Sequence, residues 1–166
     1  MDIFDLPKDL QEKAKQLKQA IEDDFPRIME VEGLNHFEAS FDNEGFEDKT
    51  VEKWQPRKTT DSRGRDKTRY RTNRVGRAGG LTSFGRKNQG RAILTGHNTG
   101  GNKLRLSIMA KVAKASVVFS SDKKYAKRHN EGTDGMPKRQ FMGHSEALDK
   151  KVFAQFQKIT DKILKG

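Results

Sequence analysis

Four histidines are the side chains of this sequence best suited to hold a metal ion or to move a proton. They are His36, His97, His129 and His144. None stands at the i, i+4 or short-loop spacing that brings metal ligands together, even with Asp122 or Asp134 as further ligands. The chain also has no cysteine, which excludes thiolate ligands, disulfides and a cysteine nucleophile. We therefore predict surface or hydrogen-bonded histidines, no metal and no cofactor.

Two serines and one glycine-rich stretch offer other kinds of catalysis. A histidine could act as general base for Ser107 or Ser145, but no spacing distinguishes such a pair from chance. The stretch "GHNTGGNK", which begins at Gly96, is similar to a phosphate-binding loop. Such a loop requires the motif GxxxxGK[ST]. Here Asn102 occupies the position of the lysine, and Leu104 follows where a hydroxyl residue is needed. We predict that the protein is not an enzyme.

A third concentration of polar and aromatic residues is the stretch "YAKRHNEGTDGMPKRQFMGHSEAL". Its glycines and proline favour a loop after a short helical turn. Tyr125 and Phe141 are candidate apolar anchors, while Gly132 and Pro137 would set the backbone geometry. Arg139 can pair with a carboxylate or a backbone carbonyl. We interpret this stretch as a rigid loop that leads into the last helix, and not as an active site.

Charge is distributed unevenly along the 166 residues. Residues 1–56 hold 7 Lys/Arg against 15 Asp/Glu, residues 57–91 hold 12 against 2, and residues 92–166 hold 15 against 6. The middle segment is too poor in apolar residues to offset its ordering entropy, which predicts a long mobile loop or an extended arm. Its candidate contacts to phosphates or to an acidic partner are Arg63, Arg65, Arg69, Arg71, Arg74 and Arg77.

The elements that must position these residues can be read from hydrophobic spacing. Two helical stripes are expected before the arm, with Asp5 and Pro7 at the start of the first and Pro26 ending or kinking it. The first stripe is Leu10, Ala14, Leu17, Ile21 and Phe25, and the second is Ile28, Val31, Leu34, Phe37 and Phe41. The turn residues "DNEGF" stop the second helix. Trp54, just before the arm, is expected to anchor the core or its boundary.

After the arm, two strands and a helix are expected. "KLRLSIMAKV" alternates apolar residues from Leu104 to Val112, which suits a strand, with a helical turn at "LRLSI" as the alternative. "SVVFSS" is the second strand, and Lys111 to Ala115 would turn the chain between them. In the last helix Ser145 can cap an apolar face of Leu148, Val152, Phe156, Ile159 and Ile163. This order predicts an α+β fold, with N-terminal helices and a C-terminal helix on a small antiparallel sheet.

Four blocks of the chain resemble the virion-morphogenesis, or tail-completion, family of Mu-like phages and prophages. The blocks are "HFEASFDNEGF", "KWQPRK", "LRLSI" and the loop that begins at Tyr125. The residues that carry the likeness are Trp54, Leu104, Ser107, Tyr125, Ala126, His129, Gly132, Pro137, Arg139, Phe141 and Gly143. The chain departs from the family pattern at Gln140, where a proline is common, and in the length of the basic arm.

The resemblance implies a non-enzymatic structural subunit that acts late in virion assembly, in tail completion or head-tail joining at the neck. It implies one domain over residues 1–166, with an acidic helical region (1–56), a basic arm (57–91), and strands plus a C-terminal helix (92–166). Copies are expected to form a homo-oligomeric ring, of six subunits to match a tail tube, that contacts the tube or tail terminator and the head connector.

Two further expectations concern location and DNA. No apolar run approaches membrane length and "MDIFDLPKDL" lacks the features of a secretory signal, which predicts a soluble protein without a membrane partner, in the host cytoplasm during assembly and then in the virion. Basic residues that line a ring could contact DNA in transit. The alternative function, from the arm alone, is non-specific nucleic-acid binding, in which Tyr70 and Phe84 could stack on bases.

Overall fold

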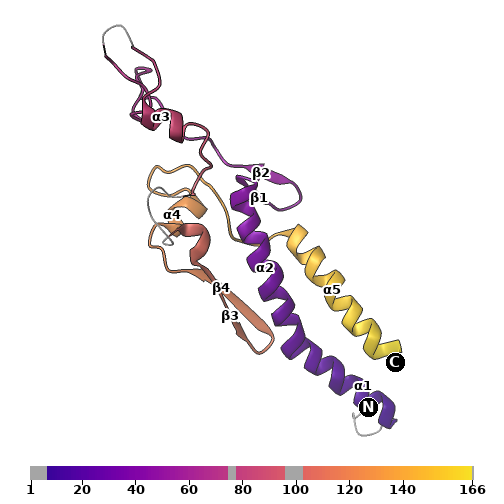
Figure 1. Ribbon diagram of the computed structural model, residues 1–166. Coiled ribbons are helices and arrows are strands. Elements are labelled where there is room, and N and C mark those ends of the chain that lie inside the picture. The colour runs from indigo at the N-terminus through magenta and orange to yellow at the C-terminus, as the bar shows by residue number, and fades with distance from the viewer. Residues whose placement is uncertain (1–6, 75–77, 96–102, 166) are drawn as a thin grey trace.

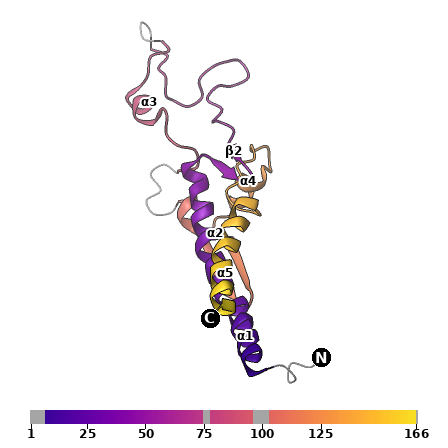
Figure 2. The same cartoon turned by 90° about the vertical axis from the view of Figure 1, so that its right-hand side faces the viewer.

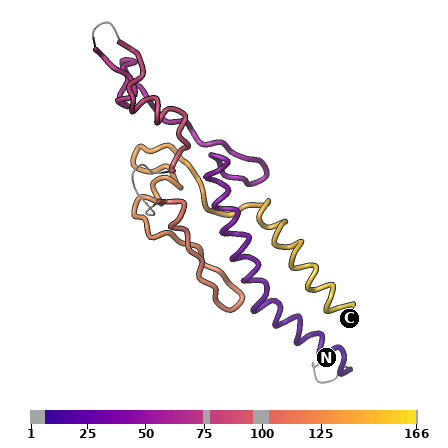
Figure 3. Tube along the Cα trace, in the orientation of Figure 1, coloured from indigo at the N-terminus to yellow at the C-terminus, as the bar shows by residue number. Residues whose placement is uncertain are grey.

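The computed structural model describes residues 7–74, 78–95 and 103–165 and shows an α+β fold, as the sequence predicts. Helices α1 (Lys8–Gln19) and α2 (Phe25–Asp42) form a long rod, and α5 (Glu146–Lys165) runs back beside it (Figures 1 and 3). A hairpin of β3 (Ile108–Ala113) and β4 (Ser116–Ser121) lies along the other side of α2 (Figure 1). None of the described helices is long and apolar enough to span a membrane.

The helix continues past Pro26 without a loop, although the turn just before it is π-helical and not α-helical. A π-helical turn, Ala20–Asp24, joins α1 directly to α2, and Pro26 occupies the first turn of α2. Proline has no N–H and so cannot donate to the carbonyl of Glu22, four residues earlier. The N–H of Ala115 donates to this carbonyl at 3.1 Å, and Lys114 forms an ion pair with the Glu22 carboxylate. The tip of the β3–β4 hairpin therefore docks where the proline interrupts the helix.

Of the predicted apolar stripe of the first helix, only the last residue, Phe25, packs against the core. None of the residues of α1 is buried, and Leu10 and Ile21 are 47% and 51% exposed. In the second stripe Phe37 and Phe41 are buried, whereas Val31 is 55% exposed. A π turn contains an additional residue, which rotates the preceding positions relative to those that follow. Apolar residues spaced at 3.6 positions therefore do not form one continuous buried face along both helices.

The C-terminal helix agrees with its predicted cap and apolar face. The Ser145 hydroxyl accepts from the N–H of Leu148 at 3.1 Å and donates to the carbonyl of Glu47 at 2.8 Å. Leu148 and Val152 are buried, and the ring of Phe156 stands edge-on to that of Phe25 at 5.1 Å between centroids. The cap thus starts α5 and at the same time ties it to the segment that follows α2.

The two strands form the predicted antiparallel hairpin, but their bounds differ. The alternative of a helical turn at "LRLSI" is correct, because Leu104–Ser107 is a 3₁₀ helix, η3. Strand β3 continues through Ala113, so the predicted turn over residues 111–115 shortens to Lys114 and Ala115. Ala115, the second residue of this turn, takes a positive φ of 52°.

A second small sheet lies within the region predicted to be helical. Strand β1 (Gly45–Glu47) pairs antiparallel with β2 (Val51–Lys53). The predicted turn "DNEGF" therefore leads directly into a strand. These strands are too short for a period of two to be recognised in the sequence. Phe46 is buried in one of them and joins Phe37, Leu148 and Val152 in a core cluster between α2 and α5.

The buried imidazole of His36 should make the stability of the fold depend on pH. Its Nε2 donates to the Glu47 carbonyl at 2.9 Å, and burial, partly offset by that bond, lowers the pKa of His36 below its ordinary 6.5. Burial, with a smaller effect of Arg139, lowers the pKa of His129 as well. Below pH 6.5 the unfolded chain binds more protons than the folded one, so the free energy of unfolding should fall as pH drops toward the lowered values.

Urea unfolding at several pH values between about 8 and 5 measures this dependence. The variant His36→Gln/His129→Gln removes both groups and should show a shallower slope of unfolding free energy against pH. An unchanged slope in the double variant would contradict the assignment.

Candidate functional site at the root of the basic arm

The loop between β4 and α5 is held by a network of hydrogen bonds. It begins with α4 (Ala126–Glu131), which ends at Gly132 with φ 74°, a left-handed conformation that terminates helices. The side chain of Asn130 accepts from the N–H groups of Phe141 and Met142, both at 3.0 Å. Trp54 donates to the carbonyl of Gln140 at 2.6 Å. These hydrogen bonds hold the loop in place and fix it to the segment that precedes the arm.

Several motif residues lie together in one core cluster. Trp54, Leu104, Ala126 and Phe141 pack with Phe41 and Ile93, and Phe141 has no exposed surface. Tyr125 is different, because it is 42% exposed and its ring rests edge-on against His129. The prediction that Tyr125 is a buried anchor is therefore wrong. It precedes α4 directly, and it is the small side chain of the next residue, Ala126, that enters the core.

The remaining motif residues have local roles. Ser107 is buried, donates to the carbonyl of Leu104 at 2.7 Å and shares a hydrogen bond with Ser121. Gly143 has φ 157°, and Pro137 is half-buried. The buried Nδ1 of His129 has no hydrogen-bond partner among the described residues. The role of Asn130 could not be predicted from the sequence, because its side chain bonds to backbone 11 and 12 residues later, beyond the reach of local asparagine–backbone patterns.

Arg139 is the one motif residue whose charge is nearly buried, and it is held by carbonyl groups. Only 7% of its surface is exposed. Its Nε and Nη2 donate to the carbonyl of Gln55 at 3.1 and 3.0 Å, and Nη2 also lies 3.4 Å from that of Pro56. Burial, with a smaller contribution from Arg57, lowers the pKa of Arg139. The predicted pairing with a carbonyl is thus the one observed.

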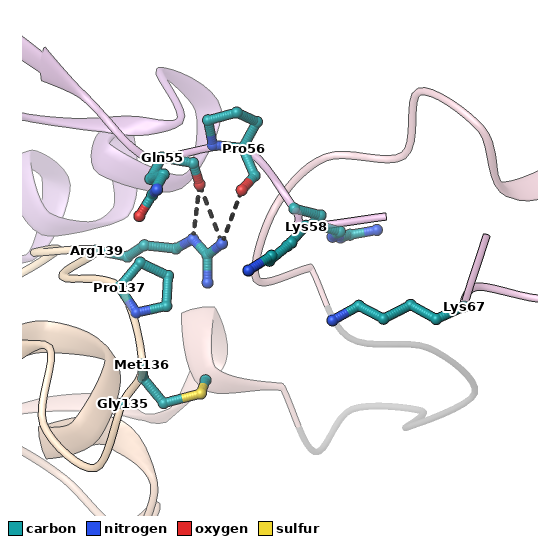
Figure 4. Close-up of a pocket in the computed structure, with 9 residues that line it drawn as sticks. Gln55, Pro56, Lys58, Lys67, Gly135, Met136, Pro137 and Arg139 are labelled. Atoms are coloured by element: carbon teal, nitrogen blue, oxygen red, sulfur yellow. Dashed lines mark hydrogen bonds between the residues drawn. The ribbon is translucent and has the colours of Figure 1, made fainter. Parts of the chain in front are cut away.

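A cavity of about 750 Å³ opens beside Arg139, between the loop and the root of the arm. Gln55, Pro56, Arg57 and Lys58 line one side, Lys67 comes from the arm, and the loop supplies Gly135, Met136, Pro137 and Arg139. Figure 4 shows the amino groups of Lys58 and Lys67 pointing toward the guanidinium of Arg139. Four of the lining side chains are cationic and none of the described ones is acidic, so the cavity is suited to an anionic group.

The arm extends away from the helices and strands (Figures 1 and 2). It is ordered by isolated bridges between Thr60 and Asp66 and between Arg71 and Leu81, and it contains a short helix, α3 (Ser83–Asn88). The sequence analysis did not expect this helix. Thr82 begins it by accepting from the N–H of Gly85. The extended arm of the prediction is therefore present with local structure of its own.

The arginines predicted to make contacts are dispersed over the arm. Arg65 pairs with Asp61, and Arg71 donates to the carbonyl of Gly79. Arg63, Arg69 and Arg74 are exposed, and Arg77 lies outside the described residues. None of them lines the cavity, where Arg57, Lys58 and Lys67 lie instead. The sequence indicated a basic arm, but it gave no sign that cations at its root face Arg139 across a cavity.

The residues first considered for catalysis are not assembled into a site. No group of three metal-ligating side chains occurs within the described ranges, and His36, His129 and His144 lie in separate surroundings. His97 and most of the glycine-rich stretch, residues 96–102, lie outside those ranges. Ser107 and Ser145 are bonded to backbone carbonyls. Comparisons with protein-family models, curated proteins and solved structures find no match.

Proposed function

We propose that this protein is a structural subunit of a phage virion that acts in tail completion or in head-tail joining at the neck. The observation that carries the proposal is that the motif residues hold the parts of the fold together. Trp54, Phe141 and Arg139 bind the loop, the core and the root of the arm into one unit, as expected of a scaffold. The sequence likeness to the tail-completion family supports the same role. The protein would work in the host cytoplasm during assembly and remain in the virion.

The distribution of charge and apolar surface supports a homo-oligomeric ring. The basic arm lies at one end of the molecule and the acidic helical rod extends toward the other (Figure 1). Such asymmetry favours head-to-tail contacts, which close into rings. Exposed apolar side chains on several elements offer further contact surface; they include Val31, Met109, Val118 and Phe153. A six-subunit ring would match the symmetry of a tail tube and present one face to the tube or terminator and the other to the head connector.

Electron microscopy of particles from a prophage that lacks this gene tests the proposal. Without the gene, lysates should contain filled heads apart from unjoined or overlong tails. A plasmid copy of the intact gene should restore joined particles. Normal virions from the deletion strain would refute the structural role.

The exposed arginines of the arm favour a second candidate function, sequence-independent binding of nucleic acid. Arg63, Arg69 and Arg74 have no ion pair with a described residue, and cations of this kind neutralise phosphates with release of counterions. In a ring they could also contact DNA as it passes. Tight binding to random duplex DNA that weakens steeply with salt would support this function, and absent binding would count against it.

Reversing the charge of these three arginines should impair contacts with partners without affecting the stability of the fold. In the variant R63E/R69E/R74E we expect an unchanged melting temperature, because the arm adds nothing to the two core clusters. Virion assembly, or DNA affinity under the second function, should fall at least about tenfold. The control K15E/K124E/K150E makes the same change of charge on the body and should retain both. Loss of folded protein in the arm variant would contradict our description of the arm.

A further inference from the structure

Positive charge is concentrated around the cavity beside Arg139, and none of the described residues that line it carries a negative charge. Burying a charge is costly unless an opposite charge compensates it, and here the guanidinium is met only by neutral carbonyls and by further cations. Lys58 and Lys67 reach the same space from the root of the arm (Figure 4). An anionic group placed in this space would satisfy three cations at once. The described lining residues therefore leave the charge of Arg139 without a carboxylate partner in the cavity.

The walls of the cavity indicate which kind of anion fits. Pro56, Met136 and Pro137 place apolar surface around the cationic floor. A nucleic-acid backbone is polar along its whole length and gains nothing from such walls. A peptide segment in which carboxylates alternate with apolar side chains can use both the floor and the walls. The lining thus favours an acidic and apolar peptide over a phosphate backbone.

The chain contains a segment of this composition before α1. Residues 1–6 read "MDIFDL", in which Asp2 and Asp5 flank Ile3 and Phe4. This segment is attached at the end of the molecule that is opposite the arm (Figure 1). The helical rod from Lys8 to Asp42 comprises 35 residues and is about 50 Å long.

The segment cannot reach the cavity of its own chain. Trp54 packs on Phe41 near the end of α2, and Gln55, the next residue, lines the cavity. The cavity therefore lies near the far end of the 50 Å rod. Asp2 lies five positions before Pro7, and a fully extended chain covers at most about 18 Å over five positions. If this segment fills the cavity, the segment and the cavity must belong to different copies.

We propose that the cavity formed by Arg139, Lys58 and Lys67 binds the acidic segment Asp2 to Asp5 of a second copy of this chain. The contact joins opposite ends of neighbouring subunits, so it is heterologous and propagates in one direction until a ring closes. It rests on the proposed function in that it supplies the subunit contact of the proposed ring.

Sedimentation velocity of the full-length chain over a range of concentrations tests the contact. D2N/D5N removes the carboxylates and K58Q/K67Q removes two exposed cations while leaving Arg139 in place. Each variant alone should self-associate at least about tenfold more weakly than the wild type. Mixed together, they should form 1:1 dimers and nothing larger, because only one segment and one cavity in each pair remain intact. The controls D23N/D24N and K111Q/K150Q should behave as wild type.

Several results would overturn the contact. These are a monomeric wild type at all concentrations, wild-type association of either variant, or a mixture that fails to form dimers. If K58Q/K67Q instead loses affinity for random duplex DNA while D2N/D5N associates normally, the cavity is a phosphate site. The prophage assay separates this proposal from the broader one. Rescue by the wild-type gene and equally by D2N/D5N would refute the contact alone, whereas normal virions without the gene would refute the role in assembly.

Discussion

Replacing Phe141 with alanine should lower the free energy of unfolding by about 3–5 kcal/mol. The side chain has no exposed surface and packs against Phe41 with ring centroids 5.4 Å apart. Its N–H is held by Asn130, so the backbone cannot easily collapse into the space that the ring vacates. Urea denaturation of the purified variant measures the loss through the midpoint of the transition.

Phe153 provides the matched control for this prediction. The same substitution can be made there, on α5, at a side chain that is 62% exposed. Phe153→Ala should therefore change the unfolding free energy by no more than about 0.5 kcal/mol. Equal stability of Phe141→Ala and the wild type would show that the loop does not anchor the core.

Gly132→Ala should cost about 2–5 kcal/mol, because the substitution has two separate effects. Gly132 has φ 74°, and an L-residue in this left-handed region costs about 1–2 kcal/mol. A Cβ there would also lie 2.7 Å from the backbone nitrogen of Lys138, and relieving such overpacking costs about 1–3 kcal/mol. Thermal and urea unfolding should both show the loss.

Gly135 separates the two contributions. It lies in the same loop with φ 73°, but a Cβ there would meet no atom within 4 Å. Gly135→Ala should therefore show only the conformational cost of about 1–2 kcal/mol. Equal losses at Gly132 and Gly135 would mean that the close approach of Lys138 relaxes without cost.

These stability variants and the contact variants should affect different properties. Phe141 and Gly132 act on the fold, whereas Lys58, Lys67 and the substituted arginines Arg63, Arg69 and Arg74 are exposed and belong to neither core cluster. Substitutions in the second group should change association or assembly at constant unfolding free energy. The proposed role in assembly predicts this separation, since the contact surface and the core are built from different residues.

The sequence by itself determined the features that depend on neighbouring residues. The serine cap and apolar face of α5, the antiparallel hairpin after residue 107, the burial of Phe141 and the α+β class all follow from short-range spacing and capping. The division into an acidic region and a basic arm follows from composition. Each of these signals lies within a few residues of the element that it predicts, so no knowledge of packing is needed.

Only the tertiary structure decided which residues meet across long stretches of chain. The carbonyls of Gln55 and Pro56 meet Arg139, more than 80 residues later, and the indole of Trp54 meets the carbonyl of Gln140. The exposure of Tyr125 and of the first apolar stripe likewise depends on which elements pack beside them. Such contacts join segments through backbone groups, which every residue carries, so the side-chain pattern holds no record of them.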